Sequence, residues 1–377
     1  MHSNTSQKYI GLDHLRALAI LMVLIYHYRM FPHPFWIDTY GRFGWTGVDL
    51  FFVLSGFLIS KQLFEQIKKS GNINFKAFYI KRFFRIIPPY VIVLILYFLF
   101  PIFREREALS PFWKFITFTQ NIELDVINFG TFSHAWSLCI EEQFYLLFPI
   151  FLLFFLKSKK LNYLVHFLIF LLFFTIAARI FSWQIFIIPK INTADFWRIW
   201  YMKIYYPTYS RLDGLVTGIL IAYFYEYDVW FRKFINSNGN LLLILGLTIV
   251  GFSFWTCNVQ TSQSASIFGF TILSAGFGLI VMSAVSKSSI LHNVKSMSTS
   301  KLATLSYSIY LSHKGIIHLT HFFLEKQNVN LESHTAFVFS ILNCFLVGLL
   351  FKYFIENPSL KIKNYLLKIN SKNDENN

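Results

Sequence analysis

Two ionisable residues, Arg16 and His27, stand eleven positions apart in the first long apolar stretch of the sequence. In an α-helix this separation is about three turns, or roughly 16 Å, and it returns to nearly the same face. Such a face would carry a fixed cation at one depth and, at another, an imidazole that can transfer a proton near neutral pH. The spacing fits a catalytic base. It also fits a histidine that is packed and hydrogen-bonded against a neighbouring helix.

A pair of carboxylates, Glu141 and Glu142, follows Trp136 in the stretch HAWSLCIEEQFY. Glu141 falls about one and a half turns into the predicted helix, at a depth similar to that of His27. A carboxylate at this depth must be paired or protonated. Glu142 projects about 100° away, so we expect only one of the two to face the same cavity. The alternative is a pair at the start of the helix, with Glu142 in water.

Other polar groups lie at the start of apolar stretches or within them, namely Asp49, Arg211, Asp213 and His313. Ionisable groups inside spanning helices mark functional sites by default. We expect Arg211 and Asp213 to compensate each other's charge or that of Glu141. The three cysteines are widely spaced, and the sequence contains no HExxH, GxSxG or phosphate-binding glycine loop. The motifs therefore predict no metal site, and they give no support to a metalloprotease, serine hydrolase or nucleotide hydrolase.

The composition predicts what must position these groups. Of the 377 residues, 55% are apolar and only 14% are charged, and the mean hydropathy is +0.49. A soluble globular protein carries about 25% charged residues. We therefore predict an all-α integral membrane protein with a bundle of about ten transmembrane helices. The predicted spans are 12–28, 45–64, 88–103, 136–156, 161–181, 208–228, 240–257, 266–287, 302–324 and 335–355.

The stretch 74–87 mixes aromatic residues with Lys76, Lys81, Arg82 and Arg85 and precedes two prolines. It is predicted to be an interfacial helix on the cytoplasmic face. Its basic side chains could anchor it to anionic lipid or could surround a phosphate group. Both interpretations remain open from the spacing alone.

The net charge of +15 indicates membrane orientation rather than nucleic-acid binding. With the N-terminus inside, 21 Lys and Arg residues fall on inner segments and 11 on outer segments. This bias predicts that both termini are cytoplasmic. We divide the chain into a transmembrane domain over 1–360 and a polar, disordered cytoplasmic tail over 361–377.

The motifs, taken together and in order, resemble the acyltransferase-3 family of integral membrane acyltransferases, over about residues 9–358. Besides Arg16 and His27, the resemblance rests on these segments: 12–17 (LDHLRA), 47–57 (GVDLFFVLSGF), 81–88 (KRFFRIIP), 134–145 (HAWSLCIEEQFY), 211–214 (RLDG), 305–313 (LSYSIYLSH) and 356–358 (ENP). Lys81 departs from the arginine that is frequent in the family, but it also supplies a cation.

The resemblance implies transfer of an acyl group, commonly acetyl from acetyl-CoA, to a hydroxyl of a carbohydrate or lipid-linked glycan. It implies that His27 is catalytic, that Glu141 orients or assists it, and that Arg16 belongs to the donor site. It further implies that Arg82 and Arg85 hold the phosphates of CoA. The other polar residues named above, Asp49, Arg211, Asp213 and His313, would support the site.

The resemblance also implies a bacterial inner membrane, contact with its lipids, and no permanently bound cofactor. Lipopolysaccharide O-antigen, capsule, exopolysaccharide, peptidoglycan and a small natural product all remain possible acceptors. Some family members carry a fused hydrolase-like domain that this sequence does not contain, so we expect the membrane domain or a partner to select the acceptor. The alternatives are a glycan or lipid transporter or flippase, and a polysaccharide polymerase. The sequence shows no repeat of the kind that many transporters have.

Overall fold

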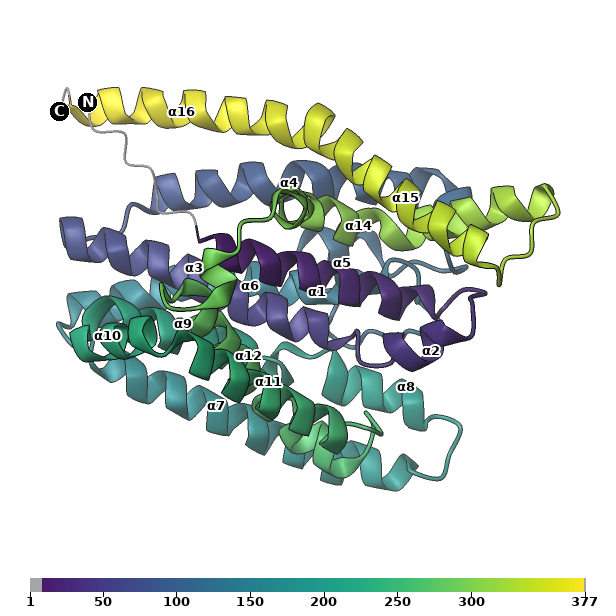
Figure 1. Ribbon diagram of the computed structural model, residues 1–377, viewed down its shortest axis with the longest axis horizontal. Helices are drawn as coiled ribbons and strands as arrows, with labels where there is room; N and C mark the ends of the chain where they lie inside the picture. The colour runs from purple at the N-terminus through teal and green to yellow at the C-terminus, as the bar shows by residue number, and fades with distance from the viewer. Residues whose placement is uncertain (1–8, 376–377) are drawn as a thin grey trace.

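The computed structural model describes the backbone of residues 9–375 and the side chains of residues 9–369. This part of the chain is helical and contains no strand, apart from one isolated bridge between Leu109 and Thr131. The long helices lie side by side along the long axis of the molecule (Figure 1). They are α1 (Ile10–Tyr28), α3 (Thr46–Ser70), α4 (Phe75–Leu99), α6 (Trp136–Lys157), α7 (Tyr163–Ser182), α9 (Asp213–Tyr227), α11 (Gly239–Thr256), α12 (Phe270–Val285), α14 (Met297–Lys326), α15 (His334–Phe351) and α16 (Asn357–Glu375).

Shorter helices connect them, namely α2 (Trp36–Gly41), α5 (Phe112–Ile116), α8 (Phe196–Trp200), α10 (Val229–Ser237) and α13 (Ile290–Asn293). Single π-helical turns extend three of the long helices: Trp183–Ile187 follows α7, Ala265–Gly269 precedes α12, and Lys352–Glu356 joins α15 to α16. In a membrane the chain must satisfy its own backbone hydrogen bonds, and these continuous helices do so.

Eight helical segments of the described chain are long and apolar enough to cross a membrane. The prediction of an all-α membrane protein is confirmed, whereas the predicted count of about ten spans is not. The spans predicted at 208–228 and 302–324 correspond to α9 and α14, which fall outside the eight. Helix α9 has only 15 residues, and α14 has 30 but is interrupted by polar side chains, including His313 and Lys314.

Helix α4 corrects the prediction of a separate interfacial helix over 74–87. It begins where expected, because the side chain of Asn74 accepts a hydrogen bond from the backbone N–H of Ala77 at 2.8 Å. However, Pro88 and Pro89 lie inside the helix instead of starting a new one. The basic residues of 74–87 and the apolar residues that follow therefore belong to one continuous rod.

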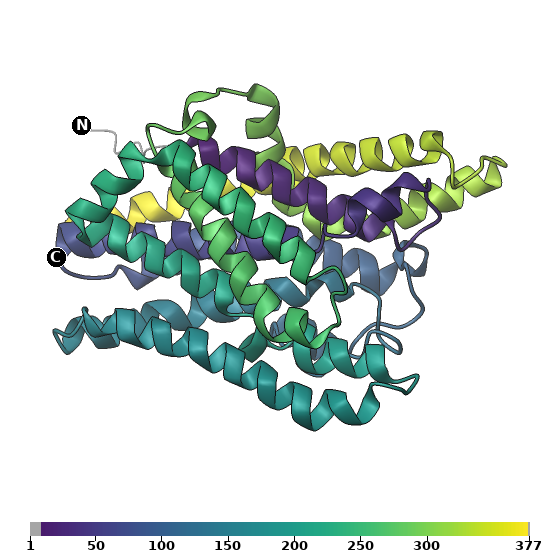
Figure 2. The ribbon, with the colours of Figure 1, turned by 60° about the horizontal axis from the view of Figure 1, so that its bottom comes forward.

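The centre of the bundle is α3. In the apolar segment Trp36–Ser70, which contains it, 78% of the 18 residues best suited to cross a membrane are buried, against 22% in the segments Tyr163–Lys190 and His334–Ile369. Helices α7 and α15 lie at opposite edges of the bundle (Figures 1 and 2). In the sequence all three are apolar, so composition does not distinguish the central helix from those that face lipid.

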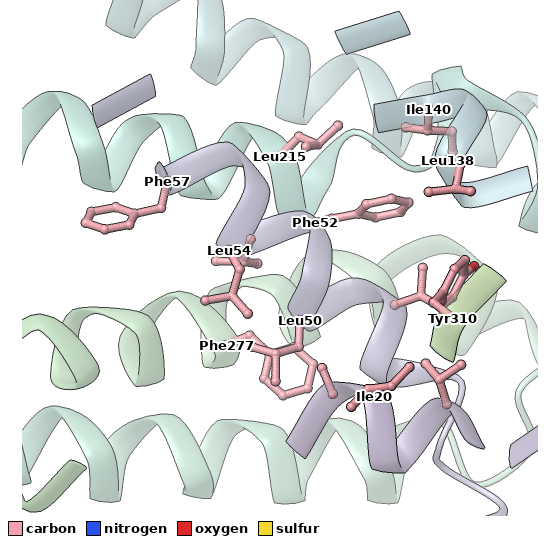
Figure 3. Packing of buried hydrophobic residues seen from close by; sticks show 14 of the residues in the cluster. Ile20, Leu50, Phe52, Leu54, Phe57, Leu138, Ile140, Leu215, Phe277 and Tyr310 are labelled. Carbon is pink, nitrogen blue, oxygen red and sulfur yellow. The ribbon is translucent and has the colours of Figure 1, made fainter. Parts of the chain in front are cut away.

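Close approach of α3 and α9 depends on two glycines. A methyl group on Gly56 would collide with the carbonyl of Leu215, and one on Gly218 would collide with the carbonyl of Val53. Small residues of this kind allow helix backbones to pack closely in a membrane. Figure 3 shows large side chains around this contact, with Phe52 of α3 pointing toward Leu138 and Ile140 of α6.

The beginning of α1 and the end of α16 lie at the same end of the bundle (Figures 1 and 2). Helix α16 continues to Glu375, so most of the segment predicted to be a disordered tail is helical. Residues 376–377 of that segment lie outside the described part of the chain. Helix α10, with Trp230 and Phe234 exposed beside Arg232, has the amphipathic character of an interfacial helix.

Candidate active site

A cavity between the helices has a volume of roughly 730 Å³. It lies between α1, α3, α4, α6 and α14, and we call it the arginine cavity because Arg16, Arg82 and Arg85 line it together. Lys61, Lys69 and Lys81 add further cations, and Glu65, Glu141 and Glu142 add carboxylates. The structure thus brings together the three arginines that the family resemblance implied for the donor site.

The guanidinium of Arg82 lies near the rings of Phe78 and Tyr145, and its hydrogen-bonding groups are only partly satisfied. One terminal nitrogen donates to Oε1 of Gln62 at 3.1 Å, while the buried Nε–H has no hydrogen-bond partner among the described residues. A buried donor without a partner is costly, because it has lost water without gaining a replacement. Arginine pairs well with phosphate groups through two parallel N–H donors. The cavity therefore has the chemistry of a site for a polyanionic ligand.

Glu141 belongs to the arginine cavity and not to the surroundings of His27. Its Oε1 accepts a hydrogen bond from the hydroxyl of Ser55 at 2.7 Å. Among the described residues, no hydrogen bond joins Glu141 to His27. The geometry thus gives no direct support to the role that the resemblance implied, in which Glu141 orients the histidine.

The smaller cavity, of roughly 150 Å³, contains His27, and we call it the histidine cavity. His134 and Lys314 also line it, together with Arg106 and an aromatic wall formed by Tyr26, Trp45, Trp136, Tyr201, Tyr205 and Tyr206. The rings of His27, His134 and His313 cluster, with centroid distances of 4.7–5.8 Å. Helices α1 and α14 and the 3₁₀ turn Ser133–Ala135 thus assemble three imidazoles that are far apart in the sequence.

Hydrogen bonds define the tautomers of His313 and His27. The Nδ1 atom of His313 lies 2.7 Å from the carbonyl oxygen of Tyr310 and 3.2 Å from that of Ile309, so it must carry the proton. In the neutral ring, Nε2 of His313 is then an acceptor, and it lies 2.9 Å from Nδ1 of His27. His27 therefore donates from Nδ1, and its Nε2 carries the free lone pair. This arrangement gives His27 the basic nitrogen that a general base or nucleophile requires.

The imidazole of His134 forms one hydrogen bond in the described chain, from Nε2 to the carbonyl of Leu311 at 3.2 Å. Since a carbonyl accepts only from N–H, the proton of the neutral ring is on Nε2. The buried Nδ1 atom has no hydrogen-bond partner among the described residues. The cavity thus contains a second imidazole with an unused lone pair.

Lys314 is a fully buried cation in the wall of the histidine cavity. Its ammonium group forms an ion pair with Glu105 at 3.0 Å and donates to the hydroxyl of Ser133 at 3.3 Å. An ammonium group has three N–H donors, and the described residues occupy two of them. The third has no partner among the described residues, and Lys314 lines the cavity.

Helix α1 connects the two cavities, because Arg16 lines one and His27 lines the other. Their separation of about three helical turns is the distance over which an extended ligand would pass from the cations to the imidazole. Arg16 and His27, which were predicted to lie at different depths on one helix, thus line two adjoining cavities.

Two buried ion pairs replace the predicted pairing of Arg211 with Asp213 or Glu141. Arg211 binds Asp49 of α3 at 2.8 Å and packs over the rings of Phe270, Tyr205 and Trp136. Asp213 binds Arg179 of α7 at 2.6 Å. Because Arg211 precedes α9 and Asp213 begins it, the two side chains reach different helices. Asp49, Arg211 and Asp213 therefore tie the bundle together and do not enter either cavity.

A loop beside the histidine cavity is held by Asp125, which precedes the cavity-lining residue Val126. Arg198 of α8 forms an ion pair with the Asp125 carboxylate at 2.8 Å. Burial raises the pKa of Asp125, but hydrogen bonds from Asn128, Arg198 and the backbone outweigh it, and the pKa lies below its usual value. The pair is therefore charged at neutral pH and ties the loop to α8.

The sequence profile described as "Acyltransferase domain" matches residues 9–356. The chain belongs to this acyltransferase-3 family. Among its relatives, the peptidoglycan O-acetyltransferase OatA of Listeria monocytogenes is 30% identical over 391 aligned residues, which cover 98% of this chain and 59% of the relative. The O-acetyltransferase OatA of Staphylococcus aureus is 27% identical over 379 residues, covering 94% and 58%. The chain thus spans about three fifths of these relatives. No solved structure matches it.

Membership of the acyltransferase-3 family confirms the resemblance and favours acyl transfer over the transporter and polymerase alternatives. The sequence argument did not select His134, Lys314 or Glu105 as site residues. A signal existed for Lys314, because it falls inside the predicted span 302–324. The 11 outer charges predicted from the sequence include Lys314 and Arg179, and both side chains are buried. Removing both from the outer set leaves the direction of the charge bias unchanged.

Proposed function

We propose that the chain is a membrane O-acetyltransferase that moves an acetyl group from acetyl-CoA to a hydroxyl group of a glycan. The family supplies the acyl-transfer chemistry, and both OatA relatives are O-acetyltransferases by name. One observation carries the proposal: a histidine with a defined basic nitrogen lines a small cavity directly beside a large cavity lined by arginines.

The donor would bind in the arginine cavity. Its volume of roughly 730 Å³ lies within the range of about 300–1,000 Å³ that is common for ligand and cofactor sites. Arg82 and Arg85 would bind the phosphates of CoA, with Arg16 deeper along the pantetheine arm. This arrangement would place the thioester at the far end of the cavity, where the histidine cavity begins.

The transfer step follows from the tautomer of His27. The acceptor hydroxyl would lie in the histidine cavity, and its oxygen would attack the thioester carbonyl carbon while its proton passes to Nε2 of His27. The third N–H of Lys314 would stabilise the oxyanion that forms. Cleavage of the C–S bond then releases CoA, whose sulfur takes the proton from His27, and leaves the acetyl ester. Transient transfer of the acetyl group to Nε2 of His27 would use the same atoms.

For the acceptor, peptidoglycan is the first glycan to test, because it is named for the Listeria relative. The names of the relatives described above give no corresponding support for lipopolysaccharide or exopolysaccharide. The tyrosine-rich wall of the histidine cavity offers both hydroxyl groups and aromatic faces to a sugar. The charge bias supports a plasma-membrane orientation with both termini in the cytoplasm, which would open the arginine cavity to cytoplasmic acetyl-CoA.

The proposal is tested with membranes or purified protein, radiolabelled acetyl-CoA and peptidoglycan fragments. Wild type should transfer label to the glycan, and His27→Ala should transfer roughly 10²- to 10⁴-fold less, the usual contribution of a general base. His166→Ala is the matched control, because His166 lies exposed on α7, away from both cavities.

Binding of acetyl-CoA, measured separately, should be the same in wild type and His27→Ala. Full transfer by His27→Ala would reject the catalytic role of this histidine. Absence of acetyl-CoA binding to the wild-type protein would reject the proposed donor.

A further inference from the structure

A thin partition separates the arginine cavity from the histidine cavity. Val48 of α3 lines both cavities. On α6, Trp136 lines the histidine cavity, and the next residue, Ser137, lines the arginine cavity. Tyr310 of α14 lies on the arginine side. Any group that passes from the donor site to His27 must cross between these side chains.

The ring of Tyr310 is fixed in this partition. Its hydroxyl donates to the carbonyl oxygen of His134 at 2.6 Å and lies 2.6 Å from the hydroxyl of Ser137. Phe51 meets the same ring edge to face at a centroid distance of 6.4 Å. A buried side chain held by two hydrogen bonds and a packed ring loses little further freedom when a ligand binds, so its size acts as a steric limit.

The volumes on the two sides of the partition differ about fivefold, roughly 730 Å³ against 150 Å³. The larger side could hold a nucleotide and an extended arm. The smaller side must hold the acyl group near His27 and also the attacking hydroxyl. In a close-packed interior, one additional methylene group is enough to disturb a site of this size.

We propose that the partition formed by Val48, Trp136, Ser137 and Tyr310 determines the length of the acyl group that this chain transfers. It would admit acetyl to the histidine cavity and exclude longer acyl chains while their CoA portion remains bound in the arginine cavity. This inference rests on the proposed function. Val48 is the specificity-determining residue that can be changed most simply, because its side chain is apolar and forms no hydrogen bond.

The test compares acetyl-CoA, propionyl-CoA and butyryl-CoA as donors by measuring kcat/KM for transfer to one glycan acceptor. In Val48→Ala the ratio of butyryl to acetyl transfer should rise about tenfold or more, as expected when space for one or two methylene groups is created. Val48→Ile should lower the same ratio. Tyr310→Phe, which removes both hydrogen bonds of the hydroxyl, should shift the ratio in the same direction as Val48→Ala but by less.

Val93→Ala is the matched control, because Val93 of α4 is fully buried and lines neither cavity. It should leave the donor ratio within about twofold of wild type. An unchanged ratio in both Val48 variants, with acetyl transfer intact, would overturn the partition as the selecting element while leaving the proposed function standing. A wild-type protein that transfers no acyl group from any of the three donors would overturn the proposed function, and this inference with it.

Discussion

The two cavities differ in how their charged and polar groups are held. In the histidine cavity, His27 bonds His313, His313 bonds a backbone carbonyl, and Lys314 pairs with Glu105. In the arginine cavity, Arg85 is exposed and Arg82 keeps a buried N–H without a partner in the described chain. In the first site, contacts among the side chains position His27 and Lys314, although the Nδ1 lone pair of His134 stays open. In the second site, the open group is an N–H donor of Arg82 that a ligand can satisfy.

This difference corresponds to the two tasks of an acyltransferase, which are to catalyse the transfer step and to bind the donor. Groups that act in a transition state must already be aligned, because reorganisation during the reaction would raise the barrier. Groups that bind a flexible polyanion can keep unsatisfied N–H donors, because the bound ligand then supplies the hydrogen bonds that these donors lost when water was excluded. Substitutions in the histidine cavity should therefore lower kcat, and substitutions in the arginine cavity should raise the KM for the donor.

The strongest test of the preorganised cavity is the Lys314–Glu105 pair. Changing Lys314→Met together with Glu105→Gln removes the cation without leaving a buried charge unpaired, so the fold should survive. We expect kcat to fall roughly 10²- to 10³-fold through loss of oxyanion stabilisation, with the donor KM unchanged. Kinetics and thermal unfolding in detergent measure the two properties.

The partly exposed pair of Lys203 and Glu123, which lines neither cavity, is the matched control; changed to Met and Gln it should have little effect on kcat. Near-normal kcat in the folded Lys314→Met, Glu105→Gln protein would show that the buried pair is only structural.

The tautomer of His27 is tested at His313, which acts as a positioning residue. His313→Ala should lower kcat about 10- to 100-fold, because Nδ1 of His27 loses its buried acceptor. His313→Gln should restore part of the activity, since its amide oxygen can accept the same proton. The pH profile of kcat should change in His313→Ala and return toward wild type in His313→Gln. Equal activities and identical pH profiles in the two variants would contradict this role.

The arginine cavity is tested with Arg82→Gln and Arg85→Gln combined. Loss of two charge-assisted contacts should raise the KM for acetyl-CoA about 10- to 100-fold, while the acceptor KM stays constant. The wild-type donor KM should also rise with ionic strength more steeply than that of the variant. Lys295→Gln, at an exposed cation outside both cavities, is the control. A change confined to the acceptor KM would place the phosphates elsewhere.

The smallest expected effect is at Glu141. Because Glu141 bonds Ser55 and lies among the arginines, Glu141→Gln should change the donor KM by less than about tenfold, the scale of one hydrogen bond. The pH profile of kcat should stay as in wild type. A collapse of kcat with a shifted pH profile would instead show that Glu141 acts on His27, and it would weaken the contrast between the cavities.

Much of this organisation could be predicted from the sequence. The apolar composition and the apolar stretches of about 20 residues predicted a helical membrane protein. In a bilayer the backbone must form its hydrogen bonds within the protein, and helices do this. The spacing of Arg16 and His27 on one helix placed a cation and a base at different depths, since helix geometry is local. The family motifs assigned the arginines that the structure places together in one cavity.

Tertiary structure alone decided the partners. His27 and His313 are 286 positions apart, and no periodicity in the sequence predicts which ring nitrogen faces which. The pairings of Arg211 with Asp49 and of Asp213 with Arg179 depend on how α3, α7 and α9 pack. The assignment of Glu141 to the arginine cavity likewise depends on the rotation of α6. The sequence alone determined that the chain forms apolar helices long enough to cross a bilayer, because that follows from local hydropathy and helix length. Only packing decided which of them meet, because contacts between helices are set by shape.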